Sequence, residues 1–120
     1  MIKSVRFAFE GLVHCFVSEK NFRIEVVAVC IAFLMAILFK LQSPEWLLIL
    51  FCSALVLSLE IFNTALERLS DIVSNSFHPE IKIVKDLAAG AVLLSSAISI
   101  IIAGFIFIPR IEIIIKSFLR

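Results

Sequence analysis

Three long apolar stretches divide the chain, and most charged residues lie in the short intervals around them. The stretches run roughly from Ile24 to Leu41, from Trp46 to about Leu69, and from Leu87 to Ile108. A helix that crosses the hydrocarbon core of a bilayer needs about 20 mostly apolar residues. The pattern therefore predicts three transmembrane helices, of which the third is ended by Pro109 and Arg110.

Short breaks separate these predicted spans. Gln42-Ser43-Pro44 is a tight break between the first two spans, and the interval 74–79 holds the turn residues Asn75 and Pro79. The chain has no internal repeat and no low-complexity tract. Its length is that of about one small domain, so we expect residues 1–120 to form a single membrane-embedded domain.

The first 20 residues follow a different pattern, in which apolar residues recur at helical spacing with polar residues between them. The apolar positions are Val5, Phe9, Leu12, Val13 and Phe16, and the polar positions are Lys3, Arg6, Glu10 and His14. This pattern predicts an amphipathic helix that lies on the membrane surface. Residues 111–120 carry a weaker version of the same pattern.

The composition agrees with a membrane protein. Apolar residues make up 62% of the chain and the mean hydropathy is +1.12, whereas a soluble domain is typically about 45–50% apolar. The formal net charge of +1 provides no basic field, so we expect no nucleic-acid partner. The three cysteines form no C-x-x-C pair, which favours small apolar side chains in helices over a metal site or disulfides.

The lysines and arginines predict the direction in which the chain crosses the bilayer. Three spans place the N-terminus and the interval between the second and third spans on the same side. That side carries seven basic residues, which are Lys3, Arg6, Lys20, Arg23, Arg68, Lys82 and Lys85. The other side carries four, which are Lys40, Arg110, Lys116 and Arg120. Because cytoplasmic segments are enriched in basic residues, the N-terminus is predicted to be cytoplasmic.

Acidic residues interrupt the second half of the second span. Glu60, Asn63, Glu67 and Asp71 are spaced by three, four and four residues, so on a helix they form one stripe about 16 Å long. A carboxylate in hydrocarbon costs several kcal/mol, and such residues usually face the interior of a bundle and mark a site. The stripe therefore predicts a site at one membrane face, with Glu60 as its deepest residue.

The stripe has the chemistry of a site for phosphates and a cation. Glu67, together with Glu19 or Asp71, offers hard oxygen ligands of the kind that Mg²⁺ uses beside substrate phosphates. Lys85 and Asp86 begin the third span on the same side, where a lysine can hold a phosphate as a point charge. No glycine-rich phosphate loop occurs in the chain.

Two other interpretations of the stripe are open. It could join helices as a polar seam in a non-catalytic membrane scaffold. It could also carry protons or ions, although the third span holds no acid or histidine and the stripe stops about halfway across the second. A site for phosphates predicts nucleotide binding. A scaffold predicts that variants of the stripe lose their assembly, and a carrier predicts proton or ion flux without ATP.

Three blocks resemble the small prokaryotic diacylglycerol kinase family, which includes the undecaprenol kinases. They are E-x-N-F-R at Glu19 to Arg23, E-I-F-N-T-A-L-E-R-L-S-D at Glu60 to Asp71, and K-D-L-A-A-G-A-V at Lys85 to Val92. The second is the most specific, since E-x-x-N-[ST]-A-x-E-x-x-x-D is the family signature. The resemblance implies an integral membrane homotrimer, with three transmembrane helices and an amphipathic N-terminal helix per chain, that transfers the γ-phosphate of ATP to a lipid alcohol.

The resemblance also implies a role for each candidate residue. Glu60 matches the general base, and Glu19 and Glu67 match the carboxylates that bind the divalent ion, expected to be Mg²⁺. The residues expected to contact the nucleotide or lie beside the base are Asn63, Asp71, Ser76, Phe77, His78, Lys85 and Asp86. Arg23 and Glu25 lie near Glu19 in the sequence and are expected to shape the lipid or nucleotide site.

Departures from the diacylglycerol branch of the family favour undecaprenol as the acceptor. Ala88 and Ala89 stand where that branch tends to have a Gly-Ser pair, and Ile24 stands where it has Gln. An N-terminal arginine that contacts nucleotide in the family has no clear counterpart, and Arg6 or Lys3 could replace it. Diacylglycerol is the alternative acceptor. The resemblance places the protein in the bacterial inner membrane, with its active site cytoplasmic.

Overall fold

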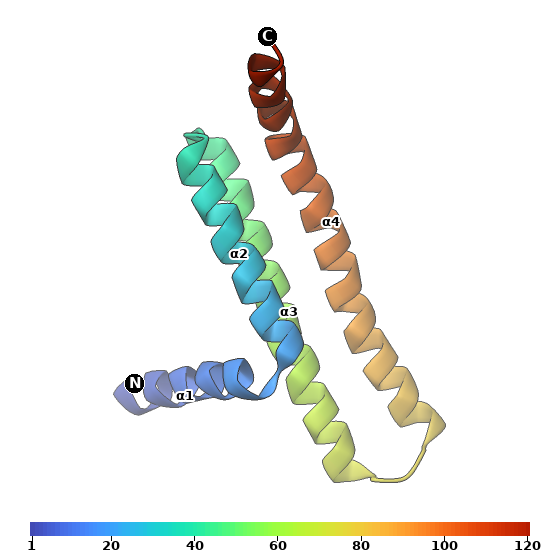
Figure 1. Ribbon diagram of the computed structural model, residues 1–120. Coiled ribbons are helices and arrows are strands. Elements are labelled where there is room, and N and C mark those ends of the chain that lie inside the picture. Colours follow the sequence, from blue (N-terminus) through green and yellow to red (C-terminus); the bar gives the residue numbers. More distant parts are fainter.

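The computed structural model describes residues 1–120 and contains four helices (Figure 1). They are α1 (Ile2–Ser18), α2 (Lys20–Leu38), α3 (Ser43–Val73) and α4 (Pro79–Phe118). The helices α2, α3 and α4 are long and apolar enough to cross a membrane, and α1 runs crosswise to them. An all-helical membrane fold with three spans is thereby confirmed. We call the end that holds α1 and the α3–α4 loop the loop end, and the opposite end, with the α2–α3 turn, the turn end.

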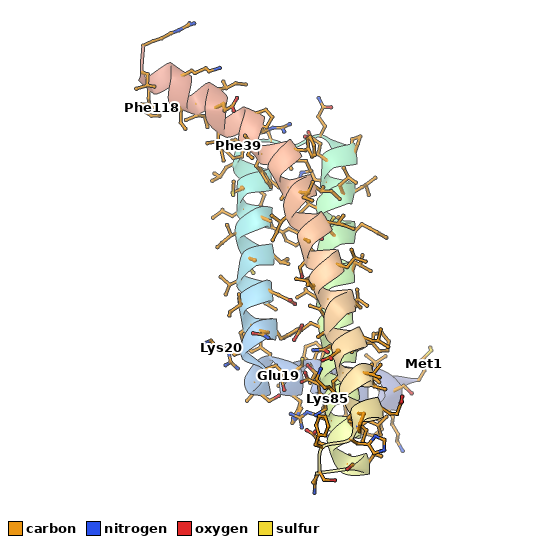
Figure 2. All side chains as sticks on the ribbon, turned by 90° about the vertical axis from the view of Figure 1, so that its right-hand side faces the viewer. Met1, Glu19, Lys20, Phe39, Lys85 and Phe118 are labelled. Carbon is orange, nitrogen blue, oxygen red and sulfur yellow. The ribbon has the colours of Figure 1, made fainter.

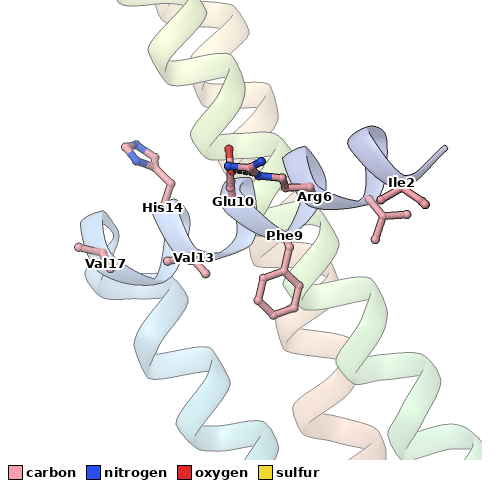
Figure 3. A pocket seen from close by; sticks show the side chains of 8 residues that line it. Ile2, Arg6, Phe9, Glu10, Val13, His14 and Val17 are labelled. Atoms are coloured by element: carbon pink, nitrogen blue, oxygen red, sulfur yellow. Dashed lines mark hydrogen bonds and ion pairs between the residues drawn. The ribbon is translucent and has the colours of Figure 1, made fainter.

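The two faces of α1 differ in polarity, as the sequence pattern predicts for a surface helix. Figure 3 shows Phe9 on the side toward which α2 runs, whereas Arg6, Glu10 and His14 lie on the opposite side. Arg6 and Glu10 form an ion pair of 3.0 Å between Nε and Oε1. The apolar residues that line the shallow groove along α1 are Ile2, Val5, Phe9, Val13 and Val17. This arrangement directs Phe9 toward the side on which α2 crosses, and the charged side chains toward the side on which α3 and α4 continue to the loop between them.

The spanning helices extend beyond the apolar stretches at the loop end. The helix α4 begins at Pro79, eight residues before Leu87. His78 caps it, because its Nδ1 accepts a hydrogen bond of 3.2 Å from the backbone N–H of Glu80. Pro79 suits the first helical position, where its missing N–H would have no partner. The additional turns carry the charged residues of the loop end.

The prediction that Pro109 and Arg110 end the third helix is wrong. The helix α4 continues through Pro109 to Phe118, and Figure 2 shows the turns before Phe118 inclined to the rest of the helix. A proline inside a helix removes one hydrogen bond and bends the axis. No glycine or second proline follows, so the helix resumes after the bend. The Arg110 side chain donates to the carbonyl oxygen of Ile106 at 2.6 Å.

Backbone hydrogen bonds close the turn between α2 and α3. The N–H of Leu41 donates to Ala36 O at 3.1 Å, and the N–H of Lys40 donates to Ile37 O at 3.2 Å. These are the two bonds of a Schellman motif, which requires a left-handed residue after the helix. Lys40 takes that position with φ 53°, the one positive φ in the chain. The motif turns the chain sharply and buries Leu41 against the end of α2.

The best-packed part of the bundle is at the turn end. The buried cluster there consists of Ala36, Leu41, Ile49, Ile106 and Phe107. Aromatic pairs support it, with ring centroids 6.1 Å apart for Phe39 and Phe107 and 6.0 Å apart for Phe33 and Trp46. Only 13 of the 120 residues are buried, so most apolar side chains face outward, as expected where lipid is the solvent.

Candidate functional site

The deep end of the acidic stripe is buried within α3. Glu60 and Thr64 are only 4% and 6% exposed, and Asn63, between them in sequence, has a buried Oδ1 atom without a hydrogen-bond partner. Glu60 forms no ion pair. A buried polar oxygen without a partner costs about 1–3 kcal/mol, so Asn63 Oδ1 is free to accept a hydrogen bond from a donor outside the chain.

Glu19 reaches the stripe from the junction of α1 and α2. It is the one residue between these helices and has an extended backbone, with φ −111° and ψ 112°. Arg68 of α3 holds it, with 3.7 Å between Arg68 Nη2 and Glu19 Oε1, and the same nitrogen donates to Ser18 Oγ at 3.2 Å. The structure thus brings Glu19 beside α3. Glu19 and Glu67 both lie near enough to Glu60 to interact with its charge.

Arg68 and Cys15 are residues of this region that the sequence analysis did not assign to the site. Cys15, buried at the end of α1, places its Sγ 4.0 Å from Thr64 Oγ1, and burial raises the pKa of the thiol above its ordinary value. The spacing contained a signal for Arg68. Thr64 and Arg68 follow Glu60 at intervals of four residues, so they form a second row on α3 that starts at Glu60 and runs next to the stripe. For Cys15 no comparable signal exists, since one cysteine on an amphipathic helix predicts packing alone.

Glu25 contributes a second buried carboxylate, from α2. Its Oε2 atom is buried and has no hydrogen-bond partner, and the side chain lies near enough to Glu60 to interact with its charge. Glu25 also lines a cavity of about 220 Å³ between α2, α3 and α4, whose other walls are mostly apolar and include Ala28, Val56 and Ser99. The acidic region therefore adjoins an apolar space inside the bundle.

The positively charged part of the site lies at its outer edge. Lys85 Nζ donates to Asp71 Oδ1 at 2.7 Å, and Lys82 Nζ donates to Asp86 Oδ2 at 2.6 Å. Lys85 and Glu19 lie at the same end of the bundle (Figure 2). On α3, Asp71 is eleven residues from Glu60, or about 16 Å along the helix. The Lys85–Asp71 pair is thus separated from the deep carboxylate by about three helical turns.

The loop residues of the prediction, 76–78, are not joined to the carboxylates by any hydrogen bond or ion pair. Ser76 exchanges hydrogen bonds with Ser74, including 3.3 Å from Ser76 N to Ser74 Oγ. Phe77 is 81% exposed, and His78 caps α4. These residues lie between Asp71 and Lys85 in the sequence and form part of the surface of the loop end. A ligand that approaches from outside the bilayer could reach their side chains.

The donor set of the site fits a hard divalent cation that substrate phosphates help to bind. No group of three histidine, cysteine or acidic residues is close enough to hold a metal ion alone. Mg²⁺ commonly uses one or two carboxylates, with phosphate and water oxygens as its other ligands. Glu19 and Glu67, from different elements but both near Glu60, supply such a pair of carboxylates.

Together, these features define a multi-pass helical membrane protein with buried carboxylates at one end of its bundle. Comparison with known families narrows this class. The family described as "Prokaryotic diacylglycerol kinase" matches residues 6–107, so the chain belongs to this family. It is therefore a lipid kinase, and kinases of this kind transfer a phosphoryl group from ATP.

Curated relatives include kinases with two different printed names. The chain is 36% identical over 108 residues to "Undecaprenol kinase" of Bacillus subtilis, covering 90% of this chain and 88% of that protein. It is 36% identical over 110 residues to "Diacylglycerol kinase" of Synechocystis, covering 91% of this chain and 63% of that protein. The "Diacylglycerol kinase" of Escherichia coli is 29% identical over 101 residues, covering 84% and 83%.

Proposed function

We propose that the protein phosphorylates undecaprenol to undecaprenyl phosphate, with ATP as the donor and Glu60 as the base. The observation that carries this proposal is the position of Glu60. It is buried and forms no ion pair. On α3 it follows Val56, which lines the apolar cavity, by one turn, and it precedes Glu67 and Asp71 of the loop end. The lipid alcohol would approach this carboxylate from the side of the cavity, and ATP would approach it from the loop end.

In the proposed reaction, Glu60 accepts the proton of the lipid hydroxyl as the hydroxyl oxygen attacks the γ-phosphorus of ATP. A bond forms between this oxygen and phosphorus, and the bond from phosphorus to the bridging oxygen of ADP breaks. The products are the lipid phosphate and ADP. Such a reaction depends mainly on positioning and on stabilising charge, which agrees with a site made of carboxylates, an amide and a lysine. Asn63 Oδ1, which lacks a partner, would orient the hydroxyl or a water beside Glu60.

Glu19 and Glu67 would hold the divalent cation, expected to be Mg²⁺, whose charge would neutralise the phosphate oxygens when it is bound. Lys85 and Asp86 would contact the nucleotide, together with Asp71 and the loop residues 76–78. Lys85 is 38% exposed and paired to an exposed carboxylate. Because exposed ion pairs contribute little stability, a triphosphate can take the place of Asp71 as the partner of Lys85.

The choice of acceptor depends on local residues. Relatives with equal identity of 36% carry the two different names, so total identity favours neither lipid. Ala88 and Ala89 on α4, and Ile24 on α2, differ from the diacylglycerol branch as described above and support undecaprenol. Diacylglycerol, which would yield phosphatidate, is the second candidate, and the same catalytic residues would serve for it.

We also propose a homotrimer in the bacterial inner membrane, with the N-terminus and the loop end in the cytoplasm. The seven basic residues at the loop end against four at the turn end support this orientation, and ATP is available on that side. The trimer follows from the family resemblance.

The decisive experiment offers undecaprenol and diacylglycerol separately to the purified protein with Mg²⁺ and γ-labelled ATP. Glu60→Gln removes the base, and Glu112→Gln is the matched control, because Glu112 lies at the turn end. Label on undecaprenol that is lost in Glu60→Gln and retained in Glu112→Gln is expected. Label mainly on diacylglycerol would replace the proposed acceptor, and an active Glu60→Gln protein would exclude Glu60 as the base.

A further inference from the structure

The helix α4 is longer than a bilayer requires. Its 40 residues span about 60 Å at 1.5 Å per residue, whereas the hydrocarbon core is about 30 Å thick. The uncharged stretch from Leu87 to Ile108 alone is long enough to cross it. In Figure 1 the end of α4 projects beyond the α2–α3 turn. We call residues 109–118 the α4 extension, and they lie past the apolar crossing at the turn end.

An ion pair fixes the level at which the α4 extension begins. Arg110 Nη2 donates to Glu45 Oε1 at 2.7 Å, and Glu45 lies in the first turn of α3. Both side chains are partly exposed, at 29% and 24%. A charged pair at the ends of two spanning helices is expected where hydrocarbon gives way to headgroups. The next helical turns therefore begin in the interfacial layer of the membrane.

The α4 extension is amphipathic around its axis. Its apolar positions at helical spacing are Ile111, Ile114, Ile115 and Phe118, with exposures of 37%, 42%, 52% and 87%. Glu112, Lys116 and Ser117 lie on the other side of the helix together with one exposed apolar residue, Ile113, and Arg120 follows just past the helix end. If the helix continued straight into water, four large apolar side chains would lose contact with lipid. The turns before Phe118 are inclined to the rest of α4 in Figure 2, so these residues turn away from the axis of the span.

We propose that the α4 extension lies in the plane of the membrane interface at the turn end, as a second surface helix on the face opposite α1. Its apolar face would rest on acyl chains, in continuity with the lipid-facing surface of the spanning part of α4. Lys116 and Arg120 would face lipid phosphates, outnumbering Glu112. An interfacial helix of this kind has apolar residues on one face and basic residues on the other.

Quenching of a single tryptophan tests this placement without use of kinase activity. In a Trp46→Phe background, which removes the one native tryptophan, the variants Ile114→Trp, Phe118→Trp and Lys116→Trp are reconstituted into phosphatidylcholine–phosphatidylglycerol vesicles. Brominated phospholipids are expected to quench positions 114 and 118 several-fold more than position 116. Aqueous iodide is expected to show the reverse order. Phe118→Trp exchanges one exposed aromatic residue for another, so it tests the apolar face with little risk to folding.

Two results would overturn the proposal. Equal access of iodide to all three positions would mean that the α4 extension projects into water as a straight helix. Protection of positions 114 and 118 from both quenchers would mean that they pack against protein, such as a second copy of the chain. Because neither result depends on ATP or on the acceptor lipid, the proposed function and this placement succeed or fail separately.

Discussion

The guanidinium of Arg68 holds the carboxylate of Glu19 beside α3, at 3.7 Å from Nη2 to Oε1. Arg68 therefore acts as a positioning residue for the proposed cation ligand. We expect Arg68→Ala to raise the Mg²⁺ concentration needed for half-maximal activity several-fold, because Glu19 then loses its anchor. Activity at saturating Mg²⁺ should fall less, since Glu60 is unchanged. The measurement is initial rate against Mg²⁺ at fixed ATP.

Arg68→Lys provides the conservative comparison, because it keeps the charge near Glu19 but loses the planar geometry that also binds Ser18. Partial recovery of the Mg²⁺ dependence is expected. A purely structural role predicts equal losses at low and saturating Mg²⁺, and that outcome would contradict the assignment.

Substitutions of Lys85 and Asp71 are expected to change the fold stability little, and the substitution of Lys85 is expected to weaken ATP binding. Asp71→Asn breaks an exposed pair and should change the free energy of unfolding by less than about 1 kcal/mol. Lys85→Ala should raise the KM for ATP several-fold while leaving the unfolding transition nearly unchanged, because the lysine is proposed to contact phosphate. Unfolding in mixed micelles and steady-state kinetics measure the two effects. Unchanged KM in Lys85→Ala would remove Lys85 from the nucleotide site.

The left-handed backbone of Lys40 predicts a stabilising substitution. A non-glycine residue in this conformation costs about 1–2 kcal/mol, and glycine removes that cost but adds about 0.5–1 kcal/mol of conformational entropy on folding. We expect Lys40→Gly to stabilise the fold by about 0.5–1 kcal/mol, measured by unfolding in mixed micelles. Lys116→Gly is the matched control inside a helix and should destabilise. Equal effects of the two substitutions would argue against the Schellman geometry of the turn.

The buried thiol of Cys15 predicts a pH dependence. Burial raises its pKa above the ordinary value of 9.0, so the folded state holds the thiol proton more tightly than the unfolded state. Its contribution to stability is therefore complete below about pH 9 and is lost as the pH rises through the higher folded pKa. With Cys30 and Cys52 replaced by alanine, alkylation at pH 8 should be slower in the folded than in the denatured protein. Equal rates would show that the thiol is accessible.

Much of the fold could be predicted from the sequence, because one physical signal dominates it. Long, mostly apolar stretches of bilayer length define α2, α3 and α4, and the change to an amphipathic helical pattern defines α1. The end of α4 was predicted wrongly because Pro109 supplies a local signal for a break, whereas the outcome depends on residues further along. A proline in a helix can either kink the helix or end it, and the helix-compatible residues that follow Pro109 allow α4 to continue.

The α3 part of the candidate site was predictable for a similar reason, since spacing on one helix fixes which side chains share a face. Contacts between different helices were harder to predict from the sequence. The attachment of Glu19 to Arg68, and the contact of Cys15 with Thr64, depend on the angle between α1 and the bundle, which no periodicity encodes. The pairing of Lys85 with Asp71 likewise depends on how far α3 and α4 continue past their apolar stretches.

Glu19 occupies the corner between a helix that follows the membrane surface and a helix that crosses it. One extended residue joins α1 to α2, and Arg23 Nη1 braces this corner by donating to Phe16 O and Val17 O at 2.9 and 2.8 Å. The α1 helix is thus held at a set angle to the bundle. If α1 rests on the membrane surface, the proposed cation site lies at the level of that surface.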